Sequence, residues 1–203
     1  MSNPLIPDRE SDFLLHEVGD AASLCELPAF AEYAASDFEM YIESCRKLSR
    51  EVLLPAYKPM DEQKPVFEDG RIKLHPLMLE IYPKVVELGV VSATRPFEVG
   101  GAQLPQTIGT LSYLYLMAAN LNVAGHVMLT TSAGHLIEAF GDAALKQAFL
   151  ERMYTGEWSG TMALTEPQAG SSLADLASMT GMHRLKLQNT AVTGDADALT
   201  GTQ

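Results

Sequence analysis

The chain has 203 residues, of which 26 are acidic and 14 are basic, and its formal net charge at pH 7 is −12. Hydrophobic residues make up 47% and charged residues 20%, which is typical of a globular protein and excludes a disordered chain. The acidic balance argues against binding to nucleic acid or to an anionic membrane surface, since both require clustered Lys and Arg. No apolar run reaches the roughly 18 residues of a membrane span, and the polar N-terminus lacks a signal-peptide pattern. We therefore expect a cytoplasmic protein.

Residues 1–35 are expected to form an N-terminal extension with short helices. Ser11 can cap a helix over 11–18, and a second short helix is expected after it. The acidic pair Glu10 and Asp12 is interpreted as solvated surface rather than as a catalytic pair of carboxylates.

A stronger helical pattern opens the main domain, residues 36–157. Apolar residues recur at spacings of three and four and so share one helix face: Phe38, Tyr41, Ile42, Cys45, Leu48, Val52 and Leu53. Ser36 is expected to cap this helix, with Glu39 completing a capping box. Pro55 is expected to end it.

A charged, proline-containing connection over 58–75 follows, and the Asp-Gly pair at 69–70 indicates a turn. Residues 76–88 are expected to be helical, with Gly89 as the stop signal. Pro83 lies inside this run and is expected to kink or divide the helix.

Three more helices are predicted after a loop rich in glycine and proline at 95–105. They run over 105–122, over 123–140 and over 142–156, and Asp142 is the N-cap of the last one. Their connections are only a few residues long, so we expect neighbouring helices to pack roughly antiparallel.

The pattern changes after Gly156, where residues 158–165 resemble a strand. The strand would deliver Thr165 to a sharp turn. Gly170 permits a close approach of the backbone or a positive φ, and Ser171 adds a hydroxyl and a backbone N–H group. Such a turn can bind a phosphate or another anion. From the residues alone, a plain turn at the end of a strand is the alternative.

The run MALTEPQAGSS at 162–172 resembles the flavin-contacting segment of the acyl-CoA dehydrogenase family. Upstream, 96–103 is similar to the glycine-rich loop of that family. Residues 141–157 are similar to the helix that precedes the flavin strand, although Lys146 and Gln147 stand in reversed order. The resemblance covers about 36–176.

The resemblance implies a mainly α fold: a helical bundle of the acyl-CoA dehydrogenase N-terminal type, followed by the first strands of an incomplete β-barrel domain at 158–203. After residue 176 the tail gives no clear element and does not align with the family. We interpret the chain as a truncated product, altered by a change of reading frame near residue 177.

The resemblance also implies a binding site for FAD. Met162, Leu164 and Thr165 match positions that line the isoalloxazine ring. Gly170 and Ser171 match the turn at the flavin pyrophosphate and the pantetheine arm of the acyl-CoA, and Ser171 matches a position that contacts substrate.

The family reaction is the α,β-dehydrogenation of an acyl-CoA thioester in fatty acid β-oxidation. A glutamate removes the α proton, the β hydride goes to flavin N5, and the electrons leave to an electron-transfer flavoprotein. That glutamate lies in a C-terminal helical domain that these 203 residues do not contain, so no catalytic residue is assigned. Glu166 belongs to the turn. We expect a homo-oligomer in the complete enzyme and no activity from this chain alone.

Two alternatives stay open at this point. The chain could be a non-catalytic helical module that assembles with a complementary chain, or the N-terminal part of an acyl-CoA oxidase or a related flavin monooxygenase.

No metal site is expected, because the histidines lack ligand spacing. His126 and His135 are expected on one helix as core or surface residues. Cys25 and Cys45 are interpreted as small buried side chains rather than as a disulfide or a nucleophile.

Overall fold

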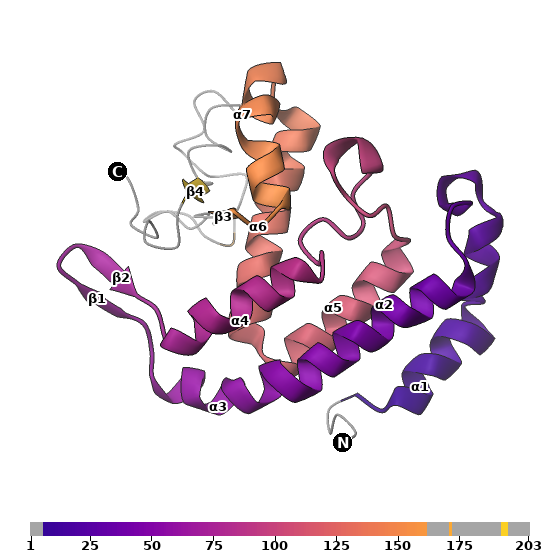
Figure 1. Cartoon of the computed structure of the whole chain (residues 1–203), viewed down its shortest axis with the longest axis horizontal. Coiled ribbons are helices and arrows are strands. Elements are labelled where there is room, and N and C mark those ends of the chain that lie inside the picture. Colours follow the sequence, from indigo (N-terminus) through magenta and orange to yellow (C-terminus); the bar gives the residue numbers. More distant parts are fainter. Residues whose placement is uncertain (1–5, 162–170, 172–191, 195–203) are drawn as a thin grey trace.

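The longest straight feature is a rod of three successive helical segments, α2 (Ala35–Leu48), a π-helical turn (Ser49–Leu53) and α3 (Leu54–Glu62) (Figure 1). The computed structural model describes residues 6–161, 171 and 192–194. The prediction that Pro55 ends the first helix is wrong. Pro55 lies in the first turn of α3, where its missing N–H group costs little, and the π turn before it accommodates the ring.

The predicted capping box at the start of α2 is also wrong. The helix begins at Ala35, so that Ser36 lies inside it. The carboxylate of Asp37 instead accepts a hydrogen bond of 2.7 Å from the backbone N–H of Ala34. An acidic side chain in the first turn also suits the positive end of the helix dipole.

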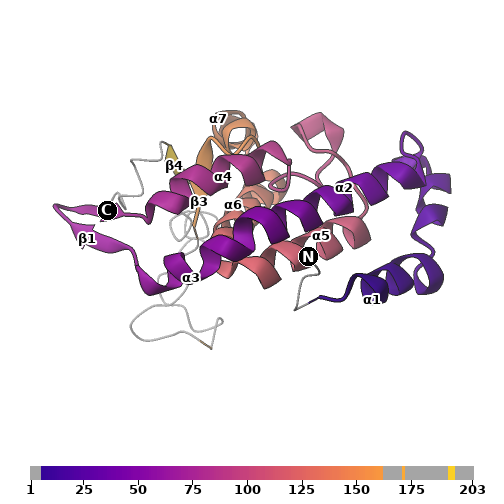
Figure 2. The ribbon, with the colours of Figure 1, turned by 60° about the horizontal axis from the view of Figure 1, so that its bottom comes forward.

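A short hairpin projects away from the helices between α3 and α4 (Figures 1 and 2). Its strands, β1 (Val66–Glu68) and β2 (Arg71–Lys73), pair antiparallel. The predicted turn is confirmed, since Asp69 and Gly70 both have positive φ, at 54° and 75°. The strands themselves were not predicted, because all their residues are exposed and no buried face imposes an alternation.

Helix α4 (Pro76–Glu87) runs through Pro83 without dividing. The carbonyl that loses its donor is that of Leu79, four residues earlier. Leu79 is 54% exposed, so water can satisfy this carbonyl. Gly89 follows the helix with φ of 74°, which confirms it as the stop signal.

Helices α5 (Gln106–Ala119), α6 (Leu121–Phe140) and α7 (Ala143–Tyr154) correspond to the three predicted helices. The N-cap role of Asp142 is confirmed by its hydrogen bond of 2.9 Å from the N–H of Leu145. A single residue, Asn120, separates α5 from α6. Among the described residues, no helix combines the length and apolarity needed to cross a bilayer.

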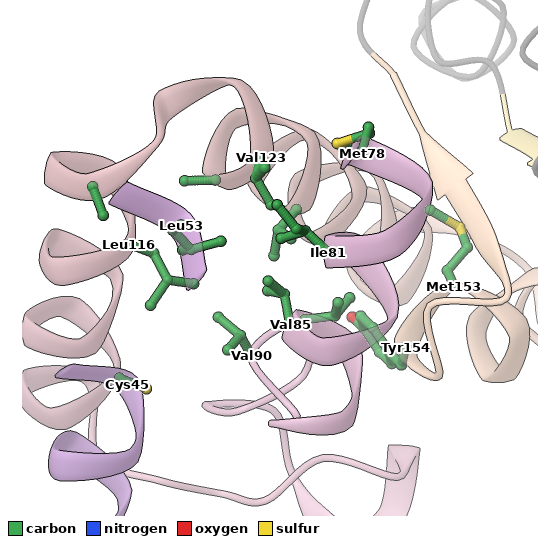
Figure 3. Close-up of a cluster of buried hydrophobic side chains, with 14 of the residues drawn as sticks. Cys45, Leu53, Met78, Ile81, Val85, Val90, Leu116, Val123, Met153 and Tyr154 are labelled. Carbon is green, nitrogen blue, oxygen red and sulfur yellow. The ribbon is translucent and has the colours of Figure 1, made fainter. Parts of the chain in front are cut away.

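The buried side chains form two clusters. The larger one lies between α3, α4, α5, α6 and α7 (Figure 3), and includes Leu53, Ile81, Val85, Leu116, Val123 and Met153. Cys45, which belongs to it, is fully buried, as expected, and both cysteines are free. The smaller cluster joins the N-terminal segment to α2 and α5 through Leu15, Phe38, Ile42, Ile108 and Tyr115.

The N-terminal segment contains α1 (Asp8–Asp12), a π turn at Phe13–Val18 and two short 3-10 helices. Ser11 does not cap a helix. It is buried inside α1, and its hydroxyl donates to the carbonyl of Asp8 at 2.9 Å. Glu10 is exposed, as expected, and Asp12 is 44% exposed but also forms an ion pair with Arg46.

Two short strands follow the helices. β3 (Trp158–Gly160) begins where the strand was predicted and pairs antiparallel with β4 (Val192–Gly194), with Trp158 opposite Gly194. β4 lies in the tail for which no element was predicted. The fold is therefore mainly helical with the first strands of a β domain, as predicted.

We expect opposite effects from one substitution at two glycines of α6. A Cβ at Gly134 would lie 2.6 Å from the ring of Tyr154, whereas a Cβ at Gly125 would meet no described atom within 4 Å. Gly134→Ala should lower the free energy of unfolding by about 1–3 kcal/mol through overpacking. Gly125→Ala should raise it by about 0.5–1 kcal/mol because alanine is the better helix former. Urea unfolding of both variants tests this, and equal effects would contradict it.

Candidate functional site

The residues predicted to contact flavin follow β3 directly. Met162, Leu164, Thr165 and Gly170 lie outside the described residues, and Ser171 is described as exposed. The described structure therefore shows which contacts position β3, the strand that leads into the run at 162–172.

β3 is fixed against α6 by two polar contacts. The backbone N–H of Gly160 donates to the hydroxyl of Thr130 at 3.1 Å, and Nε2 of His126 lies 2.9 Å from the hydroxyl of Ser159. Gly160 also lies too close to α6 for any side chain, because a Cβ there would lie 2.5 Å from the Cβ of Ala133. β3 is thus held against α6 up to Gly160, two residues before the predicted flavin-contacting run begins at Met162.

Tyr82 of α4 completes this polar cluster. Its ring meets that of His126 edge-on with 5.0 Å between centroids, and its buried hydroxyl lies beside the hydroxyls of Ser159 and Thr130. Burial lowers the pKa of His126, so the imidazole is neutral at neutral pH. His126 and His135 do lie on one helix, and no group of His, Cys, Asp and Glu in the described residues could hold a metal ion.

A second polar cluster anchors the glycine-rich loop. Arg95 donates from Nε to the carboxylate of Glu138 on α6 at 3.0 Å, and the hydroxyl of Tyr154 on α7 donates to the same carboxylate. Gly101 closes the loop over Arg95, and a Cβ there would lie 2.1 Å from the Arg95 carbonyl oxygen. Only glycine allows this close approach.

A groove of about 290 Å³ lies between α5 and α6, and Val90, Val91, Ala93 and Thr94 also line it. Its walls contain no Asp, Glu, Lys or Arg. The hydroxyls of Tyr113 and Thr131 already donate to backbone carbonyls. In contrast, the hydroxyl of Tyr41 and Nε2 of His135 are buried with no hydrogen-bond partner among the described residues.

α6 thus presents two different faces. His126, Thr130 and Ala133 face β3, whereas Met128, Ser132 and His135 line the groove. The sequence pattern had indicated only an apolar helix. It missed both faces because their partners lie far away in the chain.

Residues 35–157 match the family described as "Acyl-CoA dehydrogenase, N-terminal domain". The chain belongs to the acyl-CoA dehydrogenase family. The match covers the helices from α2 to α7 and ends just before β3.

Individual relatives agree with this assignment. The chain is 29% identical to the 3-methylmercaptopropionyl-CoA dehydrogenase of Ruegeria pomeroyi over 168 residues, which is 83% of this chain and 29% of that protein. It is 29% identical to a butyryl-CoA dehydrogenase of Syntrophomonas wolfei over 206 residues, 96% of this chain and 34% of that protein. The glutaryl-CoA dehydrogenase of Mycobacterium smegmatis has a similar fold, with a TM-score of 0.58 at 23% identity over 72% of this chain and 35% of that structure. The chain thus spans about a third of the length of these relatives.

We expect Glu138→Gln to weaken the anchor of the glycine-rich loop in a pH-dependent way. The hydrogen bond from Arg95 holds the pKa of Glu138 below its ordinary value of 4.5. The carboxylate therefore stabilises the fold above that pH, and this contribution is lost as the pH falls through the lowered pKa. The variant should lose about 1–2 kcal/mol at neutral pH, and the difference from wild type should shrink in acid.

Urea unfolding over a pH series tests this prediction. Glu80→Gln is the control, because Glu80 forms an exposed pair with Lys84 and should matter little. A Glu138→Gln deficit that stays constant down to the acid limit would contradict it.

Proposed function

We propose that this chain supplies the N-terminal helical part of an FAD-dependent acyl-CoA dehydrogenase. The observation that carries the proposal is the position of the Thr-Glu-Pro run. It follows β3 directly, at the point where the family's N-terminal domain ends in this chain. Because β3 is fixed against α6 by hydrogen bonds, the residues that follow it start from a defined position, which favours binding of a cofactor.

Met162, Leu164 and Thr165 would lie along the isoalloxazine ring, and Gly170 and Ser171 at the pyrophosphate and the pantetheine arm. The polar cluster at β3 fits this assignment. Tyr82 places a buried hydroxyl beside those of Ser159 and Thr130, and His126 supplies a neutral ring that holds Ser159. When bound, FAD would accept the hydride that leaves the β carbon of the substrate.

The acyl chain is proposed to lie on the β3 side of α6, beside the proposed flavin site. The hydride passes directly from the β carbon to the flavin, so the two must be in contact. A short acyl group is proposed, because the relatives include dehydrogenases of butyryl-CoA and 3-methylmercaptopropionyl-CoA.

Turnover would require parts of the enzyme that these 203 residues do not contain. The base that removes the α proton is proposed to come from the C-terminal helical domain. The proposed electron acceptor is an electron-transfer flavoprotein. Assembly as a homo-oligomer and a cytoplasmic location remain predictions. We expect the chain alone to be inactive, with weak FAD binding or none.

Two measurements on the purified chain test the proposal. The first is flavin binding, followed by the change in flavin absorbance and fluorescence as FAD is titrated in. The second is the acyl-CoA-dependent reduction of a dye, by the chain alone and after addition of the C-terminal two thirds of a relative. The proposal expects flavin-dependent dye reduction only in the mixture.

Thr165→Val serves as the variant and Thr161→Val as its matched control, since Thr161 is exposed and precedes the run. Equal dye reduction by both variants in the complemented mixture would contradict the placement of Thr165 at the flavin. Dye reduction by the isolated chain would contradict the expected inactivity.

A further inference from the structure

His126 lies where α4, α6 and β3 meet. Its Nε2 is 2.9 Å from the hydroxyl of Ser159 on β3, and the ring of Tyr82 on α4 packs edge-on against the imidazole. One turn further along α6, the hydroxyl of Thr130 accepts from the N–H of Gly160 and donates to the backbone carbonyl of His126 at 3.0 Å. The imidazole is thus the group in this cluster whose charge can change near neutral pH.

No acidic side chain among the described residues supports a positive charge at this position. Burial is the cause that lowers the pKa of His126, and no described carboxylate opposes it. The titratable groups around the imidazole are Tyr82 on α4 and, beside it, Tyr113 on α5. Burial raises the pKa of both hydroxyls, so they are neutral. Arg152 of α7 lies over the ring of Trp158, 4.5 Å from its centroid, and adds a positive charge beside β3.

Protonation of His126 therefore places a charge in a half-buried site. Either neutral tautomer can share the hydrogen bond with Ser159, since a hydroxyl both donates and accepts. An imidazolium keeps this bond as a donor, but its charge also requires water. β3 is the cover that moves most easily, because it is a strand of three residues, whereas α6 carries the fully buried Val123 and Val127. Acid should therefore separate β3 from α6 before the helices unfold.

We propose that His126 is a positioning residue that holds β3 on α6 while its ring is neutral, so that acid releases β3 and with it the residues that would bind FAD. The part of the inference that concerns FAD rests on the proposed function, whereas the attachment of β3 does not. The sign follows from linkage. Attachment is complete above the ordinary histidine pKa of 6.5, and it weakens as the pH falls below that value.

Hydrogen exchange of the full 203-residue chain measures the attachment, because the N–H of Gly160 is protected by its bond to Thr130. Its protection factor should fall by up to about tenfold from about pH 6.5 to 5.5, which is the limit for the uptake of one proton. The N–H of Val127, in the buried part of α6, is the internal reference and should keep its protection. A parallel fall at both amides would mean that the whole chain unfolds, and would overturn the inference.

Trp158 gives a second readout, since it is the only tryptophan of the chain and belongs to β3. Its ring packs against Phe149 of α7 with 5.7 Å between centroids. Quenching of its fluorescence by acrylamide should become stronger over the same pH range, as β3 leaves the helices. Unchanged quenching would contradict the release of β3.

His126→Gln tests the role of the imidazole, because a glutamine amide can bond to Ser159 but does not titrate. The protection of Gly160 should then not change over this pH range. His16→Gln makes the same change at an exposed histidine and should keep the wild-type pH dependence. A pH dependence that survives in His126→Gln would overturn the inference. If that variant does not fold, NMR titration of the His126 ring in the wild type replaces it, and a ring that stays neutral while the protection of Gly160 falls would overturn the inference.

Flavin titration tests the link to the cofactor. The chain is complemented with the C-terminal two thirds of a relative. Its affinity for FAD should fall by up to about tenfold per pH unit in wild type and His16→Gln, but not in His126→Gln. An unchanged affinity while β3 is released would overturn the link to FAD. If no FAD bound even at neutral pH, the proposed function would fail, and hydrogen exchange would still decide whether His126 controls the attachment of β3.

Discussion

Replacing Arg46 by alanine is expected to lower the free energy of unfolding by about 2–4 kcal/mol. This guanidinium is the main polar connection between the N-terminal segment and the helices. Its side chain is only 10% exposed, and two of its three ion-pair partners, Asp8 and Asp12, come from α1. Removing the guanidinium leaves Asp12 without an ion-pair partner, whereas Asp8 keeps its ion pair with Arg50. The loss of one partner from a largely buried charged network is costly.

Two further contacts of Arg46 add to the effect. Its Nε donates to the hydroxyl of Tyr115 at 2.9 Å, and a second nitrogen donates to the hydroxyl of Ser11 at 3.2 Å. Tyr115 is fully buried, so its hydroxyl would lose this donor inside the smaller core cluster, and only its contacts with the hydroxyl of Ser11 at 2.6 Å and with Asp8 at 3.3 Å would remain. Asp8 and Asp12 are 34% and 44% exposed and can regain water. This rehydration keeps the expected loss below the roughly 5 kcal/mol upper limit for such networks.

Urea unfolding followed by circular dichroism measures the loss. Arg71→Ala is the matched control, because Arg71 lies on the exposed hairpin and should change stability by less than about 0.5 kcal/mol. Limited proteolysis adds a local readout, since the N-terminal segment should become the first site of cleavage in Arg46→Ala. Equal stability of the two variants would refute the role assigned to Arg46.

Helices with strong local signals could be predicted from the sequence. Asp142 caps α7 and Gly89 follows α4 as expected, because these signals act within a few residues. Features that depend on an interaction across the chain were not predicted. Pro55 is tolerated because a π turn precedes it, and Asp12 is paired because α1 packs beside Arg46. Neither condition can be deduced from nearby residues.

The candidate site divides in the same way. The Thr-Glu-Pro run was found from the sequence because its residues are contiguous. The contact between His126 and Ser159 joins residues 33 positions apart, and Tyr41 and His135 line the same groove from distant parts of the chain. Such contacts depend on how α5 and α6 diverge, which hydrophobic periodicity does not determine. A glycine in a short strand, Gly160, is a local indication of a close approach.

α6 is the helix against which the proposed flavin site is placed. One of its faces contacts β3, so a displacement of β3 would separate the Thr-Glu-Pro run from this helix. The position of β3 depends on how closely Gly160 approaches the helix. Stability and cofactor binding should therefore fail together when this contact is lost.

Gly160→Val is accordingly expected to destabilise the chain by about 3 kcal/mol and to abolish any binding of FAD. Its side chain would collide with Ala133 at 2.5 Å, with Met153 at 3.0 Å and with the backbone of Thr130 at 3.2 Å. The backbone of Thr130 belongs to α6 and cannot rotate away as a side chain can, so the strand must move instead. Overpacking of this kind costs roughly 1–3 kcal/mol, and the hydrogen bond from Gly160 to Thr130 would be lost as well.

Thr161→Val is the control for this variant, because it places the same side chain one residue later at an exposed position. Unfolding in urea and flavin titration are measured on both, with the chain complemented by the C-terminal part of a relative if FAD binding requires it. A Gly160→Val protein that loses stability but binds FAD as tightly as Thr161→Val would show that β3 does not position the flavin run. A protein that keeps its stability would show that α6 yields to the strand, which the fixed helix backbone at Thr130 argues against.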